Sequence, residues 1–469
     1  MNAFQPAQAQ RWNLFTGFAQ AMESPAARAE LRGWCGLALL SLAVAGVFAL
    51  LVALSRVPGV EELAPLPVQF FDRGLVVHVV FSFVVWYLSV MGGLLTVAAH
   101  RIGAGRPPGT ALGRISLWCG YASAVLLFVP GFMDSGEPSL NNYVPMIAHP
   151  LYYAGLAILA VGLGLAVARL LLTIPGRQGP LEPVSVGAVN AAMLFTVAML
   201  CFVIAGTMLA DDPLDGAFFE NLFWGGGHIL QFVNVALMIG AWYVIGGLAL
   251  ETPLVRPNLQ SLGHVLLLGA AFLAPLFYIL FDGFSVDQNL AFTNLQYAFA
   301  LPTVIITAFA IQTMVDHRPA DGLPWRHPGF LALVTSIFVF AVGGLLGMFV
   351  DGADTRTPAH YHGVIGGVNL AFMGLFYCYF LPLMGRDIHQ GRAVNLSIWF
   401  YAVGQTFHSL GLFLAGGYGA PRKTAGADQG MEALGAQIGL YGMGVGAVVA
   451  VLGGIMFIWI SGRALIRRT

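Results

Sequence analysis

The feature that most constrains this chain is a series of apolar stretches, each about 20 residues or longer, which is the length an α-helix needs to cross a bilayer. Hydrophobic residues make up 58% of the 469 residues and charged residues only 9%, against roughly 25% charged in soluble domains. We therefore predict an all-α integral membrane protein with about twelve transmembrane helices. The predicted spans are residues 33–56, 71–99, 112–133, 149–173, 185–210, 221–250, 259–282, 292–315, 328–350, 358–384, 394–416 and 434–462.

The basic residues predict the orientation of these spans. With twelve spans, most arginines between the spans fall on the side that carries both chain ends, and acidic residues such as Asp211, Asp212 and Glu137 fall on the other. Arginine-rich segments stay in the cytoplasm, so we expect a cytoplasmic N-terminus. Residues 1–32 have no signal-peptide pattern and are predicted to be a cytoplasmic segment, followed by one membrane domain over 33–469.

Composition also limits the function classes. A net charge of −1 argues against nucleic-acid binding. The four cysteines show neither CxxC spacing nor a CxxCH motif for haem c attachment. Since no soluble domain is inserted, we expect membrane lipid as the surroundings and an external electron donor for any redox chemistry.

The most informative motif is His360-Tyr361-His362, at the start of the tenth predicted span. Residues two apart on an α-helix point about 200° apart, so this segment presents imidazoles on opposite faces and is suited to hold two cofactors side by side. Imidazole is a common axial ligand of haem iron. The predicted topology places His78, His228 and, at the end of the seventh span, Asp282 at the same outer depth of the membrane as the H-x-H motif. His408 is a further candidate for contact with a cofactor.

These residues resemble subunit I of the haem-copper oxidase superfamily, which includes terminal oxidases and nitric oxide reductases. The resemblance covers nearly the whole chain: twelve spans, an early histidine in span 2, Trp224-Gly-Gly-Gly-His228 in span 6, which is similar to the family's W-x-x-G-H, and H-x-H in span 10. It implies a haem-copper oxidase subunit I-like bundle in a bacterial cytoplasmic membrane. It also implies that His78 and His362 bind a low-spin haem and that His360 binds a high-spin haem.

Two outer segments extend the resemblance. The sequence around Arg422 and Lys423 is similar to the family's G-x-x-x-x-P-R-R, whose basic pair contacts haem propionates. Asp354-Thr355-Arg356 resembles the family's D-T segment over the propionates. Asp354, Arg356, Arg422 and Lys423 are therefore expected near the haem propionates.

The departures from the family concern the second metal. Span 7 lacks the adjacent His-His that completes the copper site with the span 6 histidine, and the sequence offers Asp282, Asp287 and Gln231 as partners for His228. One imidazole with oxygen ligands suits non-haem iron better than copper. Phe232 stands where many oxidases have the active-site tyrosine, and Tyr278 in span 7 is the candidate to replace it.

The sequence therefore predicts an oxidoreductase with two haems of b type and one non-haem metal, iron rather than copper. The favoured function is nitric oxide reduction, in which two NO, two electrons and two protons give N₂O and water. The alternatives are an O₂-reducing terminal oxidase subunit with an altered second metal site, which requires Tyr278 near the high-spin haem, and a non-catalytic dihaem protein for electron transfer or gas sensing. The electron donor is a partner subunit, a soluble cytochrome c or cupredoxin, or quinol.

Overall fold

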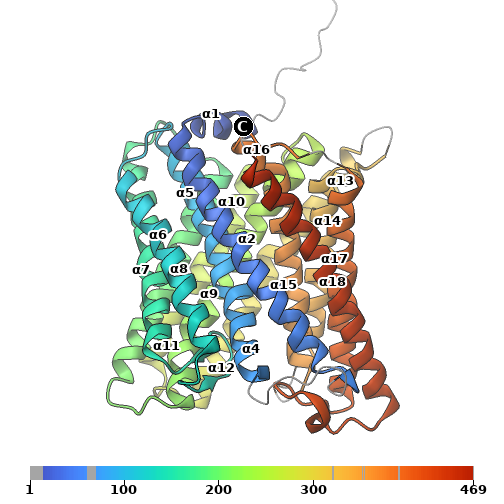
Figure 1. Cartoon of the computed structure of the whole chain (residues 1–469). Helices are drawn as coiled ribbons and strands as arrows, with labels where there is room; N and C mark the ends of the chain where they lie inside the picture. Colours follow the sequence, from blue (N-terminus) through green and yellow to red (C-terminus); the bar gives the residue numbers. More distant parts are fainter. Residues whose placement is uncertain are drawn as a thin grey trace, which may run out of the picture.

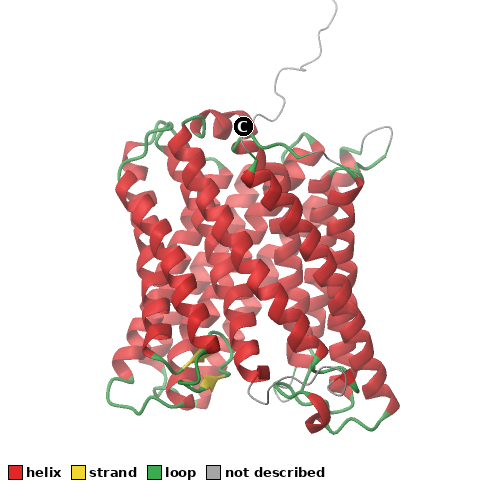
Figure 2. Ribbon diagram, in the orientation of Figure 1, coloured by secondary structure: helices red, strands yellow, loops and turns green. Residues whose placement is uncertain are grey.

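The computed structural model describes residues 14–60, 70–318, 322–350, 352, 354–388 and 391–467. Within them, long helices run side by side in a single bundle (Figure 1), and short loops join the helices at both ends (Figure 2). Residues 1–13 of the predicted cytoplasmic segment lie outside the described residues. The remainder of that segment forms α1 (Leu14–Ala21) and the first turns of α2, which starts at Pro25 behind the N-cap Ser24.

The long helices are α2 (Pro25–Leu54), α4 (Phe70–Val79) continued by α5 (Trp86–Ile102), α6 (Thr110–Phe128), α7 (Pro150–Thr173), α8 (Pro183–Met208), α9 (Gly216–Leu250), α10 (Pro257–Ala271) with α11 (Ala274–Leu280), α12 (Val286–Leu295) with α13 (Ala300–Asp316), α14 (Pro328–Gly347), α15 (Arg356–Leu375) with α16 (Leu381–Leu383), α17 (Arg392–Gly417) and α18 (Leu434–Ile466). Wider π-helical turns, η1 (Val80–Val85) and η5 (Phe376–Phe380), join α4 to α5 and α15 to α16. The 3₁₀ turns are η2 (Val129–Phe132), η3 (Ile174–Gly176), η4 (Gln296–Phe299) and η6 (Gly426–Gln429).

The number of spans confirms the predicted fold class. Eleven helical segments in the described residues are long and apolar enough to cross a membrane. The remaining predicted span corresponds to α17, which has 26 residues. The chain is therefore a helical membrane bundle of about twelve spans.

Glycines allow a close contact between α17 and α18. A Cβ at Gly453 would lie 2.5 Å from the backbone nitrogen of Tyr401, and one at Gly439 would lie 2.6 Å from that of Ala415. Small residues at such seams let helix backbones approach closely in membranes, where van der Waals packing stabilises the association. The seam brings the middle of α17, including His408, against α18.

The two ends of the bundle differ. A small antiparallel hairpin of β1 (Pro138–Ser139) and β2 (Met146–Ile147) lies at the end where α4 and α15 begin, drawn at the bottom of Figure 2. We call this the hairpin end. At the opposite end, near α1 in Figure 1, Arg169 of α7 forms an ion pair with Glu30 of α2. Only 3% of the Arg169 side chain is exposed, so this pair ties α2 to α7 inside the bundle.

Candidate haem and gas site

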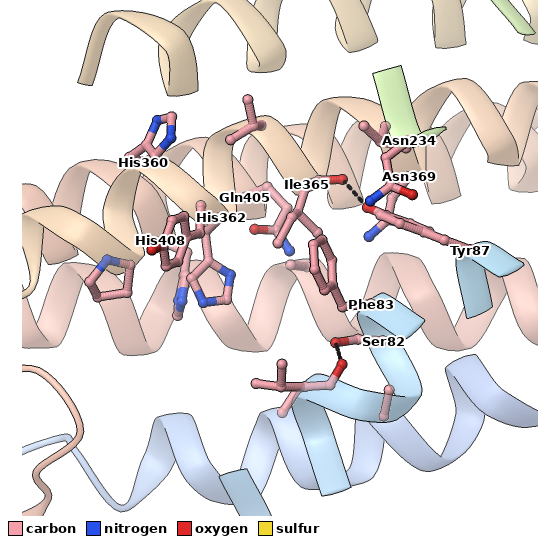
Figure 3. Close-up of a pocket in the computed structure, with 18 of the residues that line it drawn as sticks. Ser82, Phe83, Tyr87, Asn234, His360, His362, Ile365, Asn369, Gln405 and His408 are labelled. Carbon is pink, nitrogen blue, oxygen red and sulfur yellow. Dashed lines mark hydrogen bonds between the residues drawn. The ribbon is translucent and has the colours of Figure 1, made fainter. Parts of the chain in front are cut away.

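A large cavity, with a volume of about 2250 Å³, lies inside the bundle and is lined mostly by apolar side chains. Ligand sites for drug-sized molecules typically measure about 300–1,000 Å³, so this cavity has room for more than one such group. His78, His360, His362 and His408 all line it. Figure 3 shows His362 and His408 side by side, with His360 apart from them.

His78 and His360 are held in the same way. Nδ1 of His78 lies 3.1 Å from the carbonyl oxygen of Ala45 in α2, and Nδ1 of His360 lies 2.8 Å from that of Gly343 in α14. A carbonyl only accepts, so each Nδ1 carries the hydrogen and each Nε2 keeps its lone pair. Metal-binding histidines almost always donate their second ring nitrogen in this way, so both residues are suited to axial ligation of iron.

The H-x-H pair diverges as its spacing predicted. His360 faces α14, where a Cβ at Gly347 would lie 2.6 Å from its Nδ1. His362 faces α17, where its ring lies 4.3 Å from that of His408 at an angle of 73°. One turn of α15 thus presents two imidazoles to different parts of the same cavity.

His408, the further candidate for contact with a cofactor, lines the same cavity. Its Nδ1 lies 3.0 Å from the carbonyl oxygen of Met443 in α18, which leaves Nε2 as an acceptor, as in His78 and His360. The α17 and α18 seam positions it, because a Cβ at Gly446 would collide with the His408 backbone. The packing of α17 against α18 therefore determines where His408 lies in the cavity wall.

His228 has a different environment from the other histidines. Its Nδ1 lies 2.6 Å from the carbonyl oxygen of Trp224, and its Nε2 lies 2.8 Å from the hydroxyl of Tyr143. The side chain is fully buried. Tyr143 lines the cavity, whereas His228 is not among its lining residues. The phenol therefore separates this imidazole from the cavity.

The structure does not assemble the metal ligands that we expected around His228. Asp282 and Asp287 are exposed at the hairpin end, beyond α11 and at the start of α12. Gln231 lines the cavity, and its amide nitrogen lies 3.4 Å from the Gly227 carbonyl oxygen. Among the described residues, no three His, Cys, Asp or Glu side chains are grouped to hold a metal ion. The structure therefore does not bring Asp282 or Asp287 to His228.

Tyr278 does not reach the cavity either. Its ring packs 5.4 Å from that of Phe292, and its buried hydroxyl has no hydrogen-bond partner in the described part of the chain. The hydroxyl lies against Gly225, where a side chain would collide with it. Tyr143, which the sequence analysis did not select, is instead the phenol beside His228. It lies in a loop with no periodic pattern, so only its Asn-Asn-Tyr context between two spans could have drawn attention to it.

The two basic residues predicted to contact haem propionates, Arg422 and Lys423, lie at the hairpin end. Arg422 donates to the carbonyl oxygen of Gly352 at 3.1 Å and to Oδ1 of Asn142 at 2.7 Å, and Lys423 donates to the carbonyl of Leu140. Both basic side chains also line the cavity. Burial, together with the nearby Arg422 charge, lowers the pKa of Lys423. These two cations are thus placed to face anionic groups in the cavity while they hold the hairpin.

Asp354 and Arg356 form a separate ion pair of 2.6 Å beside the start of α15. Asp354 also joins Pro421 in a backbone bridge, and Thr355 donates to the Ala420 carbonyl at 2.9 Å. The pair therefore braces the connection after α17 against the start of α15. Neither side chain is among the cavity's lining residues.

Arg56 is a further cation at the cavity that the sequence analysis did not select. Its Nη2 donates to the Pro421 carbonyl at 2.8 Å, and the residue is 7% exposed. Burial lowers its pKa to about 10. A buried guanidinium beside an apolar cavity favours an anionic partner, because an unpaired buried charge is costly.

The residues fit haem groups and do not fit a second metal. For haems, the cavity offers oriented imidazoles, an apolar wall and cations at one end, the donors that axial ligation and propionate binding require. For a second metal at His228, the described residues offer one imidazole whose ring nitrogens are both hydrogen bonded. Copper and iron sites in proteins need further nitrogen, sulfur or oxygen ligands.

Comparisons with known proteins agree with this architecture. Residues 32–456 match the family model of cytochrome c and quinol oxidase polypeptide I. A Rickettsia prowazekii protein described as uncharacterized is 24% identical over 92% of this chain and 95% of its own length. Another such protein, from Aquifex aeolicus, is 28% identical over 75% of this chain and 84% of its own length. Cytochrome c oxidase subunit 1 of Debaryomyces hansenii is 23% identical over 66% of this chain and 64% of its own.

A solved structure of a haem-copper terminal oxidase dimer has the same fold. It matches with a TM-score of 0.76 over 95% of this chain and 85% of its own, at 17% identity. The fold and the histidine-lined cavity thus define a multi-pass membrane oxidoreductase of the respiratory class. The chain belongs to the cytochrome c and quinol oxidase polypeptide I family, the haem-copper oxidase subunit I group, whose members bind haems and a second metal.

Proposed function

We propose that this chain is a membrane-bound respiratory reductase that carries two haems and reduces nitric oxide. The observation that carries the proposal is that one turn of α15 presents His360 and His362 to different parts of a single large cavity. His78 and His362 are the proposed axial ligands of a low-spin haem, and His360 that of a high-spin haem. We propose a bacterial cytoplasmic membrane with the N-terminus inside as the location.

When bound, the haems would supply one-electron chemistry and a coordination site for a diatomic gas. The protein's own part is to orient the imidazoles through the Ala45 and Gly343 carbonyls and to place Arg422 and Lys423 at the cavity's hairpin end. The mostly apolar wall disfavours water beside the gas site. Electrons would enter from a partner subunit, a soluble cytochrome c or cupredoxin, or quinol.

Electron counting favours nitric oxide over O₂. Coupling two NO molecules to N₂O and water consumes two electrons and two protons, and two haems can hold two electrons. Reducing O₂ to water consumes four, and the described residues around His228 offer no ligand set for another redox metal. The two-electron reaction therefore matches the two electrons that the proposed pair of haems can hold.

O₂ reduction is the second candidate, favoured by Tyr143. A phenol within hydrogen-bond distance of a histidine could supply a further electron and proton, a role that the sequence analysis considered for Tyr278. This candidate predicts O₂ uptake that is lost in Tyr143→Phe.

The experiment combines spectroscopy with turnover on purified protein. We expect a reduced-minus-oxidised spectrum of two haems per chain, NO consumption, and N₂O as the product. O₂ uptake without NO consumption would support the second candidate. Two haems with neither activity would support a non-catalytic dihaem protein, and a spectrum without haem bands would refute every haem-based function.

A further inference from the structure

The β1 and β2 hairpin carries Tyr143 to His228, from a loop 85 residues earlier in the chain. The two rings pack with their centroids 4.4 Å apart, and Gln296 of η4 donates weakly to the same phenol at 3.4 Å. Gly227 makes the approach feasible, because a side chain at this position would collide with Tyr143.

The hairpin is clamped from two sides. Glu220 of α9 accepts from the backbone nitrogen of Asn142 at 3.1 Å and from its side-chain amide at 2.5 Å. Arg422 donates to the amide oxygen of the same Asn142, and Lys423 donates to Leu140. Because both faces of the turn are held by charged groups, Tyr143 has a defined position in front of His228.

The hydrogen bonds determine the protonation of the imidazole. Nδ1 faces the Trp224 carbonyl, which only accepts, so Nδ1 carries the hydrogen. Nε2 therefore holds the lone pair and accepts the hydrogen of the Tyr143 hydroxyl. Burial by the protein raises the pKa of Tyr143 well above its usual value, which keeps the phenol protonated as this donor. The lone pair that a metal ion would need is thus used by the phenol.

We infer that His228 is not a metal ligand in this chain and that a metal-free Tyr143–His228 pair occupies the place of the second metal site. Three observations support this: the phenol caps Nε2, His228 does not line the cavity, and the described residues provide no grouped ligand set. The Tyr143 phenol, and no second metal, would then be the group that this part of the chain presents to the cavity. The inference deepens the proposed function, since it concerns the surroundings of the same gas site.

The first test is metal stoichiometry of the purified holoprotein. We expect total iron to equal haem iron, at two per chain, with copper far below one per chain. About one additional iron or copper per chain, absent from a His228→Leu variant, would overturn the inference and leave the proposed function standing. Absence of haem would refute the proposed function, whereas the second test below would still decide the inference.

The second test measures the coupling of the pair without activity. Thermal midpoints in detergent are compared for wild type, Tyr143→Phe, His228→Leu and the double variant, with Tyr441→Phe on the exposed side of α18 as a control. If the two residues are bonded to each other, the double variant loses no more stability than the worse single variant. Additive losses would overturn the inference, and all variants should retain both haems because neither residue is a proposed haem ligand.

Discussion

The hydroxyl of Tyr143 lies 2.8 Å from Nε2 of His228 and takes the position where a metal ion would bind this imidazole. The residues meet although one belongs to a hairpin and the other to the centre of α9. The resemblance of Trp224-Gly-Gly-Gly-His228 to the family's span 6 motif implied a metal-binding role for this imidazole, and the contact with Tyr143 uses the lone pair of Nε2 that such a role requires. It leaves the cavity histidines of α4, α15 and α17 as the candidates for iron binding.

Replacing a low-spin ligand should remove one haem. We expect His78→Ala or His362→Ala to reduce the haem content from two to one per chain, because a low-spin iron needs both axial imidazoles. The measurement is the haem content and the low-spin band of the reduced spectrum. His317→Ala, at the exposed end of α13, is the control. Retention of both haems in either variant would rule out that residue as a ligand.

His360 should control the gas-binding haem alone. We expect His360→Gly to lose the CO-induced spectral change while the low-spin band remains, since His362 faces another helix. Added imidazole should restore part of the change, because the removed side chain leaves a cavity of matching shape beside Gly347. A variant that still binds CO without imidazole would contradict the assignment.

Asp282 and Asp287 should be dispensable for turnover. Both carboxylates are exposed, so we expect Asp282→Ala and Asp287→Ala to keep NO consumption within about twofold of wild type, well under the tenfold change that 1.36 kcal/mol in the activation barrier would produce. His360→Gly serves as the inactive reference. A loss of turnover above tenfold in either aspartate variant would show that this carboxylate contributes to the reaction.

The Glu30–Arg169 ion pair should stabilise the bundle only as a pair. Breaking a buried pair costs about 3–5 kcal/mol, whereas replacing both partners by apolar residues is often neutral. We expect Glu30→Gln and Arg169→Gln to lower the thermal midpoint, and Glu30→Met with Arg169→Met to recover most of it. Glu23→Gln, at an exposed position before α2, is the control. A double variant that is worse than both single variants would contradict this account.

The Asp354–Arg356 pair should give a pH-dependent stability. Burial alone would raise the pKa of Asp354, but the hydrogen bonds and charge of Arg356 outweigh it and hold the pKa below its usual value. The carboxylate thus stabilises the fold above its unfolded pKa of about 3.9, and this contribution is lost as the pH falls through the depressed pKa. Asp354→Asn should therefore lower the thermal midpoint at pH 7 more than at pH 2. An equal shift at both would show that the charge does not contribute.

The helical bundle and the depth of the histidines could be predicted because they depend on local properties. Apolar length determines which segments cross the membrane, and the helical repeat makes His360 and His362 diverge, as the structure confirms. His78 and His362 were accordingly predicted to lie at one depth, and both line the cavity. Family membership followed from the same local motifs.

What lies beside each histidine was decided by tertiary structure. The acidic residues after span 7 were expected at His228 because their depth matched, yet depth does not determine which way a helix end faces, and Asp282 and Asp287 face outward. Tyr143 reaches His228 because Glu220, Arg422 and Lys423 hold a hairpin whose contacts span up to 283 residues of sequence. The sequence alone determined a membrane bundle with imidazoles at one depth. Only the tertiary structure decided that a phenol covers His228, because contacts between distant segments leave no periodic pattern in the sequence.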